Sequence, residues 1–167
     1  MATLFMHDPD HQGYVVLASA GTSANIIPPG YHQQAGTGLL GRTVRLKKTQ
    51  IVHDTHLDPD FISLDNETTL SVIHVPIIQH GHVQGVLEIC SDKAYAFIGA
   101  DAAIVEGVAS ELMRAWERSS YHQRLTELIQ AGISLTTLLD PQAAVQEVAV
   151  IARKTLEARF VFVTLLD

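Results

Sequence analysis

Short apolar runs separated by polar turns dominate the first hundred residues of the chain. Ala2–His7 and Tyr14–Ala20 are two such runs, divided by the polar turn Asp8-Pro9-Asp10. Short strands joined by a polar turn form antiparallel hairpins, so the pattern predicts the first two strands of a sheet. The following stretches predict a loop over residues 26–38, a short helix over Leu39–Leu46, an apolar segment at Ile51–His53 and a long irregular loop over residues 54–70.

A second hairpin is predicted from the apolar runs Val72–Ile78 and Val83–Cys90 around the turn His80-Gly81. A two-residue turn places Glu88 opposite Ile73, and strict alternation then separates two faces. One face is almost wholly apolar and is expected to lie under helices, while the other is mixed and is expected to floor a small-molecule pocket. The apolar face is predicted to hold Val72, His74, Pro76, Ile78, Val83, Gly85, Leu87 and Ile89, and the mixed face Ser71, Ile73, Val75, Ile77, Gln84, Val86, Glu88 and Cys90.

The chain becomes helical after residue 100. Apolar positions from Val105 to Ile133 recur at spacings of three and four, which is typical of a coiled-coil seam with a polar centre at Ser119–Thr126. This helix is expected to end near Leu138. Asp140-Pro141 then predicts the start of a second helix, Gln142–Ala158, followed by a strand over Phe160–Leu166.

Composition excludes several classes of protein. The 167 residues include 11 basic and 18 acidic side chains, a net charge of −7, which disfavours binding to nucleic acid. The single cysteine rules out a disulfide within the chain. There is no run long enough to span a membrane and no signal peptide, so we expect a cytoplasmic protein with no membrane contact.

The order and spacing of several motifs resemble the GAF domain family. The resemblance implies an α+β, profilin-like antiparallel sheet of five to six strands flanked by helices, with the first strand beside the last and a pocket on one face. The motifs are Gly38-Leu-Leu-Gly41, Ile51-Val-His-Asp54, Leu57-Asp-Pro-Asp-Phe61, Ser71-Val-Ile-His-Val-Pro-Ile77, Gly81-His-Val-Gln-Gly85-Val-Leu-Glu-Ile89 and Phe97-Ile-Gly-Ala-Asp101.

GAF domains normally begin with a helix, whereas this chain begins at the first strand. Residues 1–100 are therefore predicted to be a GAF sensor domain without that helix, residues 101–139 its C-terminal signalling helix, and residues 140–167 the first helix and strand of a second GAF domain. We expect Gln142–Ala158 to cover the apolar sheet face, within the chain or by exchange with a partner.

The resemblance also implies a ring of pocket residues that would bind a small polar ligand, such as a cyclic nucleotide or an amino-acid-like molecule. Alternatively, Thr68 and Thr69 cap a short helix, and Arg42 forms a surface pair with Asp54. The family's acidic positions on the late strand correspond to Glu88 and Cys90, so one carboxylate is replaced by a thiol. The predicted ligand-binding residues are Arg42, Asp54, His56, Phe61, Thr68, Thr69, Ser71, Glu88 and Cys90.

Catalytic and metal chemistry are not predicted. Cys90 is interpreted as a buried strand residue in preference to a reactive thiol, because one thiol cannot reduce its own sulfenic acid as a sulfoxide-reducing cycle requires. The pairs His53/His56 and His80/His82 lack a third ligand, and His74 is expected to be a hydrogen-bonded core residue. The chain is thus predicted to be no enzyme, with no metal and no cofactor.

The resulting functional prediction is a sensory or regulatory GAF domain of a signal-transduction protein, such as a histidine kinase of a two-component system, a cyclase or a transcriptional regulator. It would bind an unknown small molecule and transmit the signal through a homodimeric coiled coil of residues 101–138. The alternatives are a structural dimerisation module without ligand and a redox or cofactor-bearing GAF domain.

Overall fold

A computed structural model describes the chain except for residues 22–25, 63–67, 138–140, 156–157 and 163–167. The chain divides into two compact units, Met1–Met113 and Arg114–Asp167, which are described separately. The predicted division at residues 100 and 139 stays a prediction. No helix in the described part of the chain is long and apolar enough to cross a membrane.

The first unit contains one six-stranded antiparallel sheet, with the strands in the order β3-β2-β1-β6-β5-β4. Its strands are β1 (Ala2–Asp8), β2 (Gly13–Ala20), β3 (His32–Gln34), β4 (Gln50–Val52), β5 (Ser71–Gln79) and β6 (His82–Ser91). The helices among the described residues are α1 (Gly38–Leu46), the short 3-10 turn η1 (Thr55–Leu57), α2 (Gly99–Thr137) and α3 (Pro141–Thr155). The first strand pairs with the last, so the predicted α+β class and strand order are confirmed.

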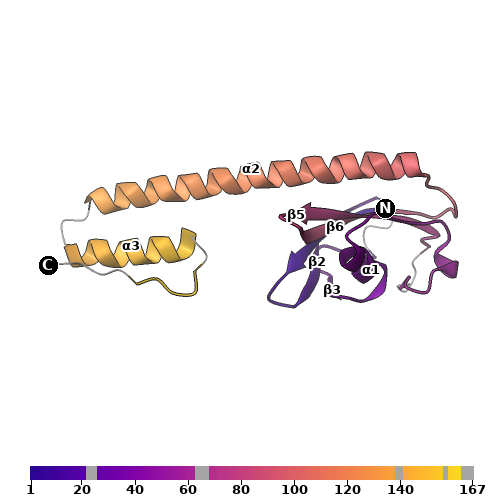
Figure 1. The fold of residues 1–167 in the computed structure, drawn as a ribbon, viewed down its shortest axis with the longest axis horizontal. Helices are drawn as coiled ribbons and strands as arrows, with labels where there is room; N and C mark the ends of the chain where they lie inside the picture. Colours follow the sequence, from indigo (N-terminus) through magenta and orange to yellow (C-terminus); the bar gives the residue numbers. More distant parts are fainter. Residues whose placement is uncertain (22–25, 63–67, 138–140, 156–157, 163–167) are drawn as a thin grey trace. The chain divides into compact units, whose positions relative to one another are not determined.

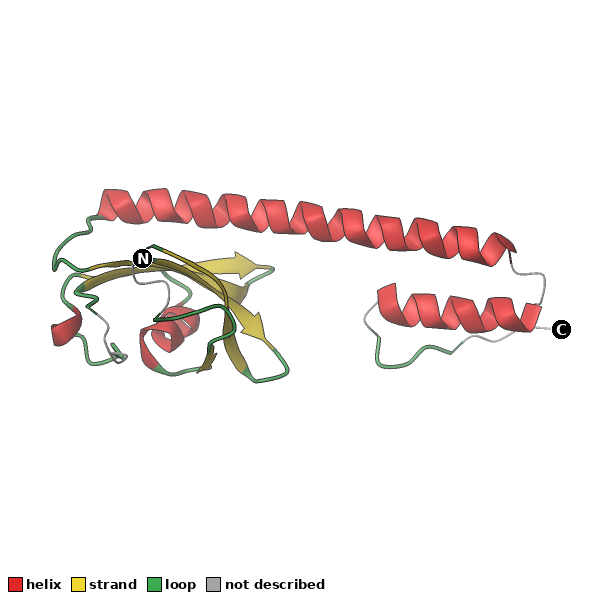
Figure 2. Ribbon diagram, turned by 180° about the vertical axis from the view of Figure 1, so that it is seen from behind, coloured by secondary structure: helices red, strands yellow, loops and turns green. Residues whose placement is uncertain are grey.

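Helices lie on both faces of the sheet, with α1 on one side and the first turns of α2 on the other (Figures 1 and 2). On the α2 side, Ile73, Val75 and Ile77 pack against Ala102 and Ala109. Because the two alanines are small and lie on one stripe of α2, the helix axis can lie close to the strands. The other apolar residues between the helix and the sheet complete this layer of the core.

A second apolar layer lies between the sheet and α1. Phe5 and Val86 from the central strands contact Leu40 of α1, and all three are at most 2% exposed. Val72 packs with Leu39 in an adjoining cluster. Because α1 is only nine residues long, it covers part of this face and leaves space beside it.

The pairing of β5 with β6 differs from the prediction. Next to the turn, Ile78 pairs with Val83, as a two-residue turn predicts. Between Ile77 and Ile78 the register then shifts by one residue, and Gln84 lies opposite no residue of β5. His74 therefore pairs with Glu88, where strict alternation placed Ile73.

This bulge reverses the two predicted faces on β5 only. Leu87 and Ile89 lie on the α2 side, and Glu88 lies on the opposite side, as predicted. However, His74 and Val72 lie on the α1 side, and Ile73 lies under α2. A count from the turn cannot detect one unpaired residue, so it pairs the residues beyond the bulge one position out of register.

Three other expectations need correction. Residues 32–34, expected within a loop, form the edge strand β3. Val105 and Leu112 of the predicted coiled-coil seam pack against the sheet, so the seam cannot begin with them. Phe160–Phe162, the described part of the predicted last strand, has no strand structure, and residues 163–167 lie outside the described part.

Gly41 allows the closest approach between α1 and the segment before it. A Cβ atom at this position would lie 2.3 Å from the backbone carbon of Gly36, which itself has a φ of +85°. We expect Gly41→Ala to lower the free energy of unfolding by about 1–3 kcal/mol because the backbone must move. Gly107→Ala is the matched control, since a Cβ on that helical glycine meets nothing within 4 Å. The control should raise the free energy of unfolding by about 0.5–1 kcal/mol. Urea unfolding measures both variants, and equal effects of the two substitutions would contradict the close approach at Gly41.

Candidate ligand-binding site

A cavity of about 280 Å³ lies beside α1 on the sheet face that carries Glu88. Its walls come from β1, β3, β5, β6, α1 and two loops, and about half of the lining residues are apolar. The lining residues are Phe5, Ile27, Tyr31, His32, Gln33, Gln34, Thr37, Leu39, Leu40, Phe61, Ile62, His74 and Glu88. Apolar walls combined with polar groups that can orient a ligand are typical of a small-molecule site, and this cavity has a larger polar share than most.

A buried pair of ionisable side chains forms part of the cavity wall. Nε2 of His74 lies 2.6 Å from Oε2 of Glu88, and the two residues are 2% and 9% exposed. A proton on Nε2 is assigned from this contact, because a carboxylate can only accept. On the other side of the ring, Nδ1 lies 3.4 Å from the hydroxyl of Thr43. The imidazole is thus held between helix α1 and strand β6.

The second carboxylate oxygen of Glu88 lacks a partner. Oε1 is buried and contacts no hydrogen-bond donor among the described residues. A buried charged acceptor without a donor typically costs about 1–3 kcal/mol or more. Because Glu88 also lines the cavity, a molecule that brings a donor into the cavity would remove this cost.

Arg42 fastens the loop after β4 to helix α1. Its guanidinium donates to both carboxylate oxygens of Asp58, at 2.9 and 2.6 Å, and to Asp60 at 3.1 Å. The hydrogen bond from Arg42 lowers the pKa of the Asp58 carboxyl below its usual range, against the opposing effect of burial. The backbone N–H of Phe61 donates to the Asp58 carbonyl, so the salt bridge positions an aromatic wall of the cavity.

Two of the nine predicted ligand-binding residues line the cavity, Phe61 and Glu88. Arg42 pairs with Asp58 and Asp60, and the predicted pair with Asp54 does not form.

The remaining predicted residues have structural contacts elsewhere. The side chain of Asp54 accepts from the N–H of His56 at the start of η1, and the carbonyl of Thr69 accepts from a threonine hydroxyl of that turn. Ser71 is fully buried and donates to the carbonyl of Lys93. Exposed Thr68 does not line the cavity. Cys90 belongs to the same buried cluster as Leu39, which itself lines the cavity. Whether any of the nine binds a ligand stays a prediction.

Sequence reasoning missed His74 and the whole β3 wall. His74 was assigned to the opposite face because the bulge leaves no trace in the hydrophobic pattern. Gln33 and Gln34 were assigned to a loop because a three-residue edge strand is too short to show alternation. The one available signal was the sequence Gln33-Gln34, two amide side chains in succession before a glycine-rich turn.

The family model for the GAF domain matches residues 1–117. The chain belongs to the GAF domain family. This membership makes it, at the level of the family, a sensory or regulatory domain. A search of curated proteins found no match.

Three solved structures illustrate the breadth of this fold. A free methionine-R-sulfoxide reductase from Neisseria meningitidis superimposes with a TM-score of 0.62 at 24% identity, covering 70% of this chain and 66% of that one. A reductase of the same kind from Thermoplasma acidophilum gives 0.59 at 22%, covering 68% and 75%. The GAF domain of a phosphoenolpyruvate-protein phosphotransferase from Coxiella burnetii gives 0.61 at 24%, covering 71% and 73%.

These reductases correct one expectation. The chain was predicted to be no enzyme, but the GAF domain shares its fold with enzymes that reduce free methionine-R-sulfoxide. The prediction that the chain is no enzyme is therefore wrong, because proteins of this fold include enzymes. Identities of this size establish the shared fold, and any activity needs its own argument.

The Arg42–Asp58 salt bridge predicts a pH-dependent loss of stability. A carboxyl whose pKa is lowered in the folded state contributes stability above its unfolded pKa of about 3.9 and loses it as pH falls through the folded value. We expect Asp58→Asn to cost about 1.5–3 kcal/mol at neutral pH. As the pH falls below the unfolded pKa of about 3.9 and through the lower folded pKa, the difference from the unaltered protein should shrink, since the carboxyl becomes protonated.

Urea unfolding of both proteins across this pH range measures the effect. Exposed Asp92 provides the control, and Asp92→Asn should change little at any pH. A difference for Asp58→Asn that stays constant with pH would show that the charge is not responsible.

Proposed function

We propose that this GAF domain is a sensor that binds a small molecule carrying a hydrogen-bond-donating, preferably cationic, group against Glu88. The observation that supports this choice is that Glu88 lines the cavity and that one of its two carboxylate oxygens is buried without a hydrogen-bond donor among the described residues. A cation there gains a charge-assisted hydrogen bond, whereas an anion would be repelled.

The other cavity walls define the rest of the ligand. Phe5, Leu40 and Phe61 offer apolar contact, and Gln33 and Gln34 come from strand β3 on another wall. The volume of about 280 Å³ lies at the lower end of ordinary ligand sites. A small amine or an amino-acid-like molecule fits these properties best, which narrows the predicted class of small polar ligands.

A ligand panel tests the proposal. Free amino acids, free methionine sulfoxide, small amines and matched carboxylic acids are screened by thermal shift, and each hit is titrated by calorimetry. Binding of an amine should raise the melting temperature, and Glu88→Gln should weaken it at least tenfold, because a charged hydrogen bond is worth about 1.5–3 kcal/mol. Asp92→Asn serves as the control.

Two results would count against this proposal. A preference for acids over amines would contradict the role of Glu88, and so would equal binding by Glu88→Gln. If nothing in the panel binds, a structural dimerisation module becomes the better account of the domain.

Reduction of free methionine sulfoxide is the second candidate function. Two structures of the same fold are reductases for the R form of this compound, and Cys90 belongs to the same buried cluster as Leu39, which lines the cavity. The Cys90 sulfur would take the sulfoxide oxygen, giving methionine and a sulfenic acid. Two equivalents of an external thiol would then restore the cysteine, releasing water and a disulfide. The external thiol is required because the chain has one cysteine.

An assay with dithiothreitol decides on this candidate. Release of methionine by the unaltered protein, abolished by Cys90→Ser, supports it. Binding of methionine sulfoxide without turnover supports sensing alone.

Signal transmission is proposed to run through α2 into a homodimer. The exposed side chains Ile104 and Val108 are four residues apart, as are exposed Leu125 and Ile129. Three heptads separate the two pairs, so both occupy the same positions of a heptad repeat. The equivalent positions between the two pairs are mostly polar, namely Glu111, Ala115, Arg118 and His122. The two exposed apolar pairs would therefore be separate contact points for a second copy of the helix. The partner domain on the output side would be a histidine kinase, a cyclase or a transcriptional regulator.

The dimer can be tested with charge. We expect Val108→Glu combined with Leu125→Glu to convert a dimer into a monomer, because like charges would face each other across the seam. Ser110→Glu is the control, since Ser110 lies on the opposite side of the helix from Val108 and is exposed. Light scattering coupled to size-exclusion chromatography gives the mass, and a monomer for the unaltered protein at high concentration would refute the coil.

A further inference from the structure

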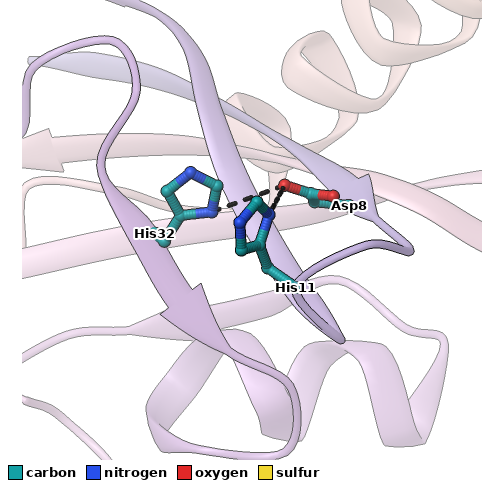
Figure 3. Close-up of side chains that lie close together, drawn as sticks. All are labelled: Asp8, His11 and His32. Atoms are coloured by element: carbon teal, nitrogen blue, oxygen red, sulfur yellow. Dashed lines mark hydrogen bonds and ion pairs between the residues drawn. The ribbon is translucent and has the colours of Figure 1, made fainter.

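Three side chains converge beside the turn between β1 and β2. Asp8 ends β1, His11 lies in the following turn, and His32 begins β3 (Figure 3). Both imidazoles point toward one oxygen of the Asp8 carboxylate. Nδ1 of His11 lies 2.8 Å and Nδ1 of His32 3.5 Å from Oδ2. One ligand atom from each residue lies within 4.8 Å of the others.

The distances match those between ligands of a tetrahedral metal ion. Zinc bonds of about 2.0–2.1 Å to nitrogen and oxygen place neighbouring ligand atoms roughly 3.3 Å apart. The two separations at Asp8 fall on either side of that value. Two imidazoles and one carboxylate are also a donor set that suits Zn²⁺ and related late divalent metals, whereas Mg²⁺ and Ca²⁺ prefer oxygen alone.

The carboxylate is held in place by the backbone around it. Its other oxygen, Oδ1, accepts the N–H of Asp10 at 3.1 Å, which fixes the orientation of Asp8 within the turn. His32 is fixed by the pairing of β3 with β2, where it lies opposite Val15. Such contacts to ligand residues orient them before the metal arrives. The imidazoles are themselves 66% and 43% exposed, so an ion can reach them from solvent.

We propose that Asp8, His11 and His32 form a binding site for one Zn²⁺-type divalent ion. The ion would tie the edge strand β3 to the turn between β1 and β2, in addition to the short β2–β3 pairing and the backbone hydrogen bond from Ala35 to Gln12. Three protein ligands leave a coordination position open to water or to another ligand. His32 also lines the cavity, and the next two residues of β3 do as well, so the ion would order one wall of the cavity. The site does not depend on what the cavity binds.

Sequence analysis could not find this site. It considered the histidine pairs at 53/56 and 80/82 because they are close in sequence, but His32 is twenty-one residues from His11. Only the pairing of β3 with β2 brings them together, and β3 was expected to be loop.

Zinc binding to the full chain tests the proposal. Calorimetric titration with Zn²⁺ should show one tight equivalent. His11→Ala, His32→Ala and Asp8→Asn should each weaken it at least about tenfold, the scale expected when a metal site loses part of its support. Asp8→Asn keeps an oxygen for the Asp10 N–H, and both histidines are exposed, so the variants should fold. The double variant His80→Ala/His82→Ala is the control, because it removes two exposed histidines that flank another turn.

Hydrogen exchange supplies a second measurement that is independent of the ligand in the cavity. Zn²⁺ should slow exchange of the amides in β3, an effect that disappears in His32→Ala and after EDTA is added. The proposal is overturned if the control weakens binding as much as the site variants, if only one of the two histidines matters, or if no equivalent binds. If no amine in the panel binds but zinc binding is intact, that result would count against the Glu88 proposal alone.

Discussion

One unpaired residue in β6, Gln84, decides which side chains of the central hairpin share a face of the sheet. Beyond Gln84 the two strands pair so that His74 lies opposite Glu88. The neighbouring apolar side chains of the hairpin then form two layers, one on each face of the sheet. Ile73 and Val75 lie under α2, while Val72 lies with α1. The bulge therefore places an ionisable pair on the face that α1 covers only in part.

The cost of burying His74 and Glu88 is offset by their mutual hydrogen bond at only one of the two carboxylate oxygens. The bond from His74 satisfies one oxygen of Glu88 and the other has no donor among the described residues. Structures tolerate such groups mainly where function requires them. This acceptor is the basis of the proposal that the ligand carries a hydrogen-bond donor, since a donor would remove the cost of burying it. The Arg42 salt bridge and the β3 strand hold the remaining walls in position around that acceptor.

Most of the fold could be predicted from the sequence because its elements are long enough to show a period. The strands β1, β2, β5 and β6 and the helix α1 follow the apolar runs closely. Features decided by one residue or by distant pairing could not be predicted. The bulge at Gln84 reversed the faces of β5, three residues of β3 were too few to show alternation, and Arg42 bonded with Asp58 where Asp54 was expected. The candidate site was predicted least well, since its lining comes from loops and strand ends whose positions depend on those same features.

The central claim is that His74 and Glu88 meet on the buried cavity wall, and nuclear magnetic resonance of the His74 ring tests it most directly. The structure predicts a slowly exchanging, strongly deshielded Nε2 proton that is lost in Glu88→Ala and shifts when a ligand enters the cavity. A His74 ring in rapid exchange with water, with a spectrum unchanged by Glu88→Ala, would contradict the register, the pair and the site built on them.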